Sequence, residues 1–185
     1  VGGNYNAALF FDGSDDKIEF ANTADLCDMG TGNFTWECWV RPTDGSNGGT
    51  AVLMGTRNAT GSGTGSYLYM TDSTANSNVR FHWRNSSNGS ADIELGNSVG
   101  CPANQWSHIA VVRNGTKLTL YLNGLDHSST SGGTNPATVS TDAAKSDAGV
   151  FTIGASGVAS NFYNGCMQDV RVYKGVAKYT TNFVP

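Results

Sequence analysis

The sequence has few charged residues, few prolines and no long apolar run. Charged side chains make up 14% of its 185 residues, and four residues are proline. A coiled coil or helical bundle would contain far more Ala, Glu, Lys, Leu and Arg, so both classes are excluded. No segment approaches the roughly 18 uninterrupted apolar residues of a membrane span. The net charge of −4 gives no electrostatic reason to expect nucleic acid or an anionic membrane as partner.

Several short chemical motifs are also missing. The four cysteines form no CxxC pair, and the three histidines form no HxH or HExxH pattern, so no zinc-site spacing is present. There is no GxSxG elbow, no glycine-rich phosphate loop and no basic cluster. The chain begins with Val and shows no signal-peptide pattern, so we expect a processed product or a piece of a longer protein.

Uncharged polar residues and aromatic residues are abundant in the sequence. Gly, Ser, Thr and Asn together make up roughly two residues in five. Four Trp, seven Tyr and eight Phe are too many for a disordered tail. No repeat and no shift in composition marks a boundary, and the length suits one domain, so we predict a single domain over residues 1–185.

Alternation of apolar and polar residues is the dominant pattern. Over residues 33–41 one face holds Phe34, Trp36, Cys38 and Val40, while the intervening residues form the other face. Similar short runs cover residues 8–11, 17–20, 51–54, 67–70, 79–84, 107–113, 117–122, 150–154 and 167–173. Residues 126–148 show little pattern and are predicted to be a long loop. Short strands separated by turns, with no helical period, predict an all-β antiparallel two-sheet sandwich.

One hairpin is indicated most clearly. The runs 107–113 and 117–122 flank Asn114-Gly115-Thr116. Asn-Gly readily supplies the two positive φ angles of a type I′ turn, so we expect that turn here. A second Asn-Gly, at Asn123-Gly124, predicts another turn directly afterwards.

The motifs and their order resemble the laminin-G-like, concanavalin A-like jelly-roll family. The matching segments are Phe11-Asp12-Gly13, Phe34–Pro42, Trp106–Val112, Leu118–Gly124, Ile153-Gly154 and Asn164–Tyr173. The ending, Lys174–Pro185, is similar to the endings of such domains in bacteriophage structural and tail proteins and in bacterial surface proteins. The resemblance implies a jelly roll in a virion or extracellular setting that binds a glycan or cell-surface polysaccharide without catalysis.

The same resemblance implies a structural calcium ion between the first turn and the last strand. Asp12 and Asp169 match the family's positions, whereas Gln168 stands where another acid is usual. Asp15 and Asp16 add carboxylates beside Gly13, and Ca²⁺ prefers such oxygen ligands. The alternative is a solvated acidic turn, because Asp is common in turns.

Aromatic and polar residues on two predicted strands are the candidate ligand-binding set. A sugar stacks its apolar face on an aromatic ring while polar groups bind its hydroxyls. Alternatively, these rings cover the second face of a sandwich, which is their commoner use. The candidates are Tyr67, Tyr69, Arg80, His82, Arg84 and Tyr163.

Two other functions stay open. A structural domain would bind neighbouring virion or surface-protein subunits through its loops. A β-glucanase would need Glu-x-Asp-x-(x)-Glu on one strand, and the nearest segment, Asp92-Ile93-Glu94, lacks the third acid. The cysteines Cys27, Cys38, Cys101 and Cys166 allow three disulfide pairings, and free buried thiols are the expectation for Cys38 and Cys166.

Overall fold

Two antiparallel sheets form a sandwich, as the alternating pattern predicts. The computed structural model describes residues 7–21, 28–43, 49–56, 65–71, 76–83, 93–96, 100–126, 137–139 and 150–185. Sheet A contains, in order, β1 (Leu9–Asp12), β14 (Asn164–Lys174), β3 (Phe34–Pro42), β9 (Ser107–Asn114), β10 (Lys117–Leu122) and β11 (Leu125–Asp126), with β12 (Ala137–Thr138) beside β10. Sheet B contains, in order, β2 (Ile18–Phe20), β13 (Phe151–Ile153), β4 (Thr50–Gly55), β5 (Tyr67–Thr71), β6 (Asn76–Trp83) and β7 (Ile93–Gly96), with β8 (Cys101–Pro102) beside β6.

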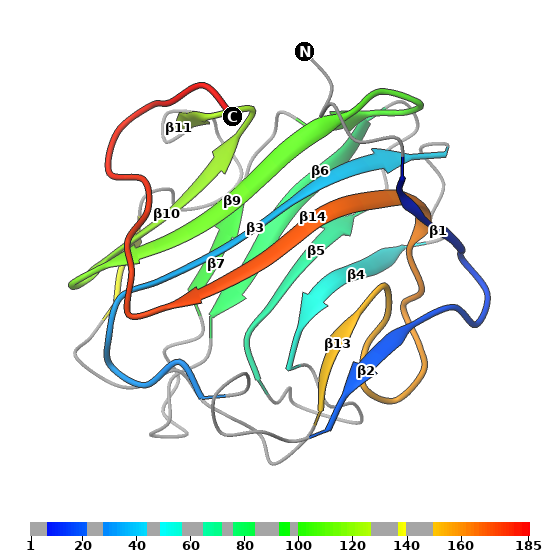
Figure 1. The fold of residues 1–185 in the computed structure, drawn as a ribbon, viewed down its shortest axis with the longest axis horizontal. Helices are drawn as coiled ribbons and strands as arrows, with labels where there is room; N and C mark the ends of the chain where they lie inside the picture. The colour runs from blue at the N-terminus through cyan, green and yellow to red at the C-terminus, as the bar shows by residue number, and fades with distance from the viewer. Residues whose placement is uncertain are drawn as a thin grey trace.

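The two sheets are layered face to face. β14, β3 and β9 cross in front of β5, β6 and β7 (Figure 1). The described residues contain no helix, and hence none long and apolar enough to span a membrane. The predicted all-β sandwich is therefore confirmed.

The core lies between the sheets and is rich in aromatic rings. The predicted inner face of β3 is buried: Phe34, Trp36, Cys38 and Val40 are at most 1% exposed. The Trp36 ring meets Phe81 of β6 and Phe151 of β13 edge-on, at centroid distances of 5.6 and 5.4 Å. These contacts join sheet A to sheet B, so the core fixes how the outer faces are placed.

The two Asn-Gly turns differ from each other. Asn114 pairs with Lys117, so Gly115 and Thr116 occupy the turn, and of these two only Gly115 has a positive φ (60°). This is the type II′ pattern, and the predicted type I′ turn at Asn114-Gly115 is wrong. Asn123 and Gly124, with φ of 51° and 75°, form the type I′ pattern between β10 and β11 instead.

The last residues of the chain cover part of the outer face of sheet A. Residues 175–185, here called the C-terminal strap, run back past β9 and β10 toward β11 (red in Figure 1). Tyr179 and Phe183 of the strap stack with their ring centroids 3.5 Å apart. They belong to a second apolar cluster, built on Ala110 and Val112 of β9 and Tyr121 of β10.

A buried carboxylate on β3 holds the strap. Glu37 is 1% exposed, accepts a hydrogen bond from Lys178 Nζ on Oε1 (2.6 Å), and accepts another from the Tyr179 hydroxyl on Oε2 (2.7 Å). His108 Nε2 lies 3.5 Å from Oε2, and Arg171 lies 3.5 Å from Oε1. Burial alone would raise the pKa of Glu37, but the hydrogen bonds from His108, Lys178 and Tyr179 outweigh it and lower the pKa to about 2. Glu37 therefore stays ionised at all ordinary pH values.

Candidate ligand-binding face and acidic turn

Four of the predicted ligand-binding residues lie together on the outer face of sheet B. Tyr67 pairs with His82 and Tyr69 pairs with Arg80 across β5 and β6. Paired residues in antiparallel strands point to the same face, and their neighbour Leu68 is buried in the core. The alternation within each strand thus turns all four outward from the sandwich interior.

The rings on this face are in direct contact. Tyr67 stacks on His82 with centroids 5.0 Å apart and an interplanar angle of 23°. The Tyr67 and Tyr69 centroids are also 5.0 Å apart. Tyr67, Arg80 and His82 are half-buried, whereas Tyr69 is 6% exposed. Tyr67 and His82 therefore form the accessible aromatic surface, and Tyr69 supports Tyr67 from beside it.

Two further candidates do not join this group. Arg84 lies outside the described residues. Tyr163 is fully buried, packs edge-on against Phe11 at 6.1 Å, and donates its hydroxyl to the Cys166 carbonyl oxygen at 3.3 Å. The prediction that Tyr163 contacts ligand is wrong, because its ring fills the core where Gly165 has no side chain to exclude it.

The acidic turn after β1 brings three carboxylates together. Asp12, Asp15 and Asp16 each offer an oxygen within 4.8 Å of the others. Asp12 Oδ1 accepts a hydrogen bond from the backbone N–H of Ser14 (2.7 Å), and Asp16 Oδ2 accepts one from the N–H of Asp12 (2.9 Å). These bonds shape the turn and engage one oxygen of Asp12 and one of Asp16.

Asp169 does not belong to this turn, contrary to the prediction. In the pairing of β1 with β14, Asp12 is opposite Asn164 and Leu9 is opposite Met167, so Asp169 lies beyond the far end of β1. A β-bulge between Gln168 and Arg171 gives Asp169 a φ of 53°, and its carboxylate accepts a hydrogen bond from Arg171 at 3.0 Å.

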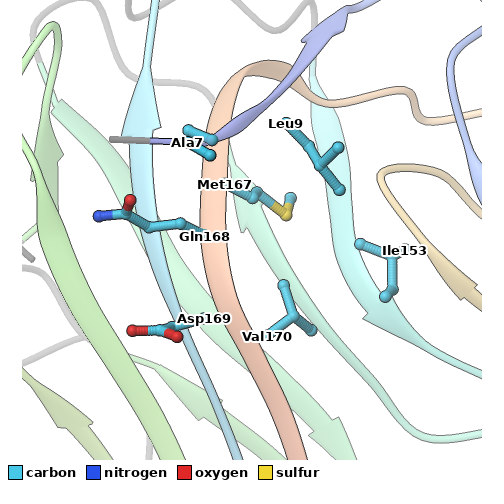
Figure 2. Close-up of a pocket in the computed structure, with 8 residues that line it drawn as sticks. Ala7, Leu9, Ile153, Met167, Gln168, Asp169 and Val170 are labelled. Atoms are coloured by element: carbon cyan, nitrogen blue, oxygen red, sulfur yellow. The ribbon is translucent and has the colours of Figure 1, made fainter. Parts of the chain in front are cut away.

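Asp169 lines a different feature, an apolar pocket of about 340 Å³ at the edge of the sandwich. Figure 2 shows Met167 and Val170 pointing toward Leu9 and Ile153, with Gln168 and Asp169 on the other side of β14. The Asp169 carboxylate therefore faces away from the apolar side chains, and it is the one carboxylate among the described residues that line this pocket.

The described cysteines are free thiols. Cys38 and Cys101 are buried, Cys166 is partly buried, and Cys27 lies outside the described residues. Burial raises the pKa of Cys101 to about 12 and that of Cys38 still further. The buried thiols are thus protonated and act as small apolar core residues.

Comparison with known proteins identifies the class. The model of the concanavalin A-like lectin/glucanases superfamily matches residues 12–178, and the chain belongs to that family. No curated protein sequence matches the chain significantly.

Solved structures show the same fold at low identity. Domain 4 of AbnA, an extracellular arabinanase from Geobacillus stearothermophilus solved with arabinotriose, is 15% identical with a TM-score of 0.55, covering 94% of this chain and 73% of that one. The CBM40 of a Ruminococcus gnavus sialidase, solved with sialyllactose, is 14% identical with a TM-score of 0.61, covering 90% of this chain and 89% of that one. A putative carbohydrate-binding protein from Bacteroides ovatus is 19% identical with a TM-score of 0.60, covering 93% of this chain. The present chain spans 44% of that last protein's length.

Proposed function

We propose that this chain is a single-domain, non-catalytic carbohydrate-binding module that holds its glycan on the outer face of sheet B. The observation that carries the proposal is the partly exposed Tyr67 ring, stacked on His82 at 5.0 Å. An aromatic ring held flat by a neighbour is a platform for the apolar C–H face of a sugar, and fixing it beforehand lowers the entropic cost of binding. His82 and Arg80 provide polar groups for the hydroxyls around it.

The chemistry of the strands supports a binding role rather than hydrolysis. Glycosidases need two carboxylates roughly 5–9.5 Å apart across the sugar. Strands β4, β5 and β6 contain no Asp or Glu in their sequences, and the neighbouring strand β7 carries a single carboxylate, Glu94, opposite His82. The relatives in fold that were solved with arabinotriose and sialyllactose also support a glycan partner. We place the module in an extracellular or virion surface protein.

The test is a glycan array, followed by calorimetry with the best ligand. The Tyr67→Ala variant is expected to weaken binding about tenfold or more, since a stacked ring contributes about 1.5 kcal/mol or more. Phe10→Ala is the matched control, because it removes an exposed aromatic ring from sheet A and should leave affinity unchanged. Equal affinity of the Tyr67→Ala variant and the parent would contradict the proposal.

One observation favours a second function, assembly with neighbouring subunits. β1 and β2 end their sheets on the same side of the molecule (Figure 1), and they expose Leu9 (53%), Phe10 (61%) and Phe20 (39%). Edge strands with apolar side chains are suited to pairing with another chain. A mass measurement in solution separates the functions: a stable oligomer that binds no glycan favours assembly, and a monomer that binds glycan favours the module.

We also propose that Asp12, Asp15 and Asp16 hold a Ca²⁺ ion, with backbone carbonyls and water completing its oxygen shell. The Asp15→Asn variant is expected to weaken Ca²⁺ binding at least tenfold in calorimetric titration, because it removes one charge and no side-chain hydrogen bond of the turn. Asp28→Asn is the control, since Asp28 also caps a turn, through Gly30 N–H, outside this cluster. If the parent chain binds no Ca²⁺, or both variants bind as it does, the turn is only a solvated acidic loop.

A further inference from the structure

A groove lies at one end of the outer face of sheet A, on the sheet opposite to the Tyr67 face. Its volume is about 300 Å³, and it is lined by Trp39, Trp106, Asn123, Val184 and Pro185. Trp39 lies in β3, and Trp106 directly precedes β9. The pairing of Val40 with Ser107, both buried, places Trp39 and Trp106 on the opposite, outer face. Both indoles are half-buried, whereas Trp36 and Trp83 are only 1% exposed.

The polar group in this groove is fixed before any ligand arrives. Asn123, at a φ of 51°, accepts a hydrogen bond on Oδ1 from the backbone N–H of His108 (2.9 Å). Its own N–H donates to the His108 carbonyl at 2.8 Å. With Oδ1 engaged, the two N–H donors on Nδ2 remain for a ligand, and no hydrogen bond from Nδ2 to another described residue is present. The backbone thus orients an exposed amide beside two indole rings.

The C-terminal strap forms the remaining wall of the groove. Phe183 N–H donates to the Gly124 carbonyl at 2.9 Å, and Asp126 N–H donates to Asn182 Oδ1 at 2.9 Å. These bonds anchor the strap immediately before Val184 and Pro185, although Val184 itself is 94% exposed. Because Glu37 and the Tyr179–Phe183 stack hold the rest of the strap, the wall is part of the folded domain.

We infer that this groove is a second saccharide site, which takes one or two sugar rings of a neutral glycan. The described residues that line it carry no charged side chain, so an uncharged ligand is complementary to it. The indoles present apolar rings and N–H donors, and the Asn123 amide adds donors that match hydroxyl oxygens. The volume lies at the lower end of the range for small-molecule binding pockets, and it is too small for an extended peptide.

The two sites share no residue and lie on different sheets. The Tyr67 face belongs to β5 and β6 of sheet B, and the tryptophan groove belongs to β3, the start of β9 and the strap. Two sites on one chain would let the module hold a branched or repeating polysaccharide at two points, which raises avidity without any new contact.

The test uses ¹⁵N-tryptophan-labelled protein titrated with maltotriose, cellotriose, galactotriose and N,N′,N″-triacetylchitotriose, each to about 10 mM, where millimolar Kd values approach saturation. The four indole N–H signals are assigned with single Trp→Phe variants. We expect the Trp39 and Trp106 signals to move in a saturable way with at least one sugar. The Trp36 and Trp83 signals, from the core, should stay in place and serve as internal controls.

Variants then separate this site from the first. Trp106→Ala is expected to weaken the affinity for the sugar about tenfold. Asn123→Asp is expected to weaken the affinity for the sugar severalfold. Aspartate keeps the Oδ1 acceptor and tolerates a positive φ, so this variant preserves the fold. Tyr67→Ala leaves that affinity unchanged, even if the first site fails its own test. No indole shift with any of the four sugars, shifts of all four signals together, or loss of the shifts in Tyr67→Ala would overturn the inference.

Discussion

Replacing Glu37 with Ala is expected to destabilise the domain by about 3 kcal/mol, at the lower end of the cost of breaking a buried ion pair. The carboxylate is 1% exposed, and its removal leaves the Tyr179 hydroxyl and His108 without their acceptor. The cost stays at the lower end because the side chains of Lys178 and Arg171 are 31% and 43% exposed and can regain water. Glu37→Gln keeps the shape and should cost about 2 kcal/mol.

Urea denaturation of the parent and both variants measures this effect. Glu19→Gln is the control, because Glu19 pairs with Lys17 on the surface with side chains 42% and 27% exposed. Such an exposed pair contributes about 0–1 kcal/mol. A cost for Glu37→Ala no larger than that of the control would show that the strap does not depend on this carboxylate.

The pH dependence gives a second readout of the same network. The folded pKa of Glu37, about 2, lies below its ordinary value of 4.5. Its contribution to stability is therefore complete above pH 4.5 and is lost as the pH falls toward 2. The lost contribution amounts to about 3 kcal/mol. Because Gln does not titrate, the advantage of about 2 kcal/mol in unfolding free energy that the parent has over Glu37→Gln should disappear over this range, and a constant difference would contradict the assigned ion network.

The parts of this fold that follow from sequence are those set by local pattern. Alternation over residues 33–41 placed Trp36 in the core and Glu37 on the outer face, and the structure agrees with both. It also indicated that Tyr67 and Tyr69 share a face, because two residues apart on a strand always do. The contact of Tyr67 with His82 depends on the register between β5 and β6, which no single strand encodes.

The features that could not be predicted correctly depend on pairing between segments far apart in the sequence. Asp169 was expected beside Asp12, but the bulge in β14 and its register with β1 separate them. The burial of Glu37 on the outer face could not be predicted either, because it depends on the return of the strap. The Asn114-Gly115 turn shifted by one residue because strand pairing, rather than the dipeptide, set its position.

Trp36→Ala is expected to cost about 4 kcal/mol, the largest single effect outside the sites. The indole joins the sheets through Phe81 and Phe151, at centroid distances of 5.6 and 5.4 Å, and contacts Phe34 of its own strand at 5.9 Å. Truncation leaves a cavity among rings that are themselves fixed by their neighbours, so the core cannot collapse to fill it.

Trp36→Phe provides the matched comparison for this cavity. The buried Nε1 of Trp36 has no hydrogen-bond partner among the described residues. The substitution by Phe therefore removes an unpaired donor, and the phenyl ring retains most of the ring contacts. We expect its cost to be about 1–2 kcal/mol. Denaturant unfolding with near-ultraviolet circular dichroism measures both variants. If Trp36→Phe destabilises the domain as much as Trp36→Ala, the indole N–H must have a partner, and the core packing described here would not account for its stability.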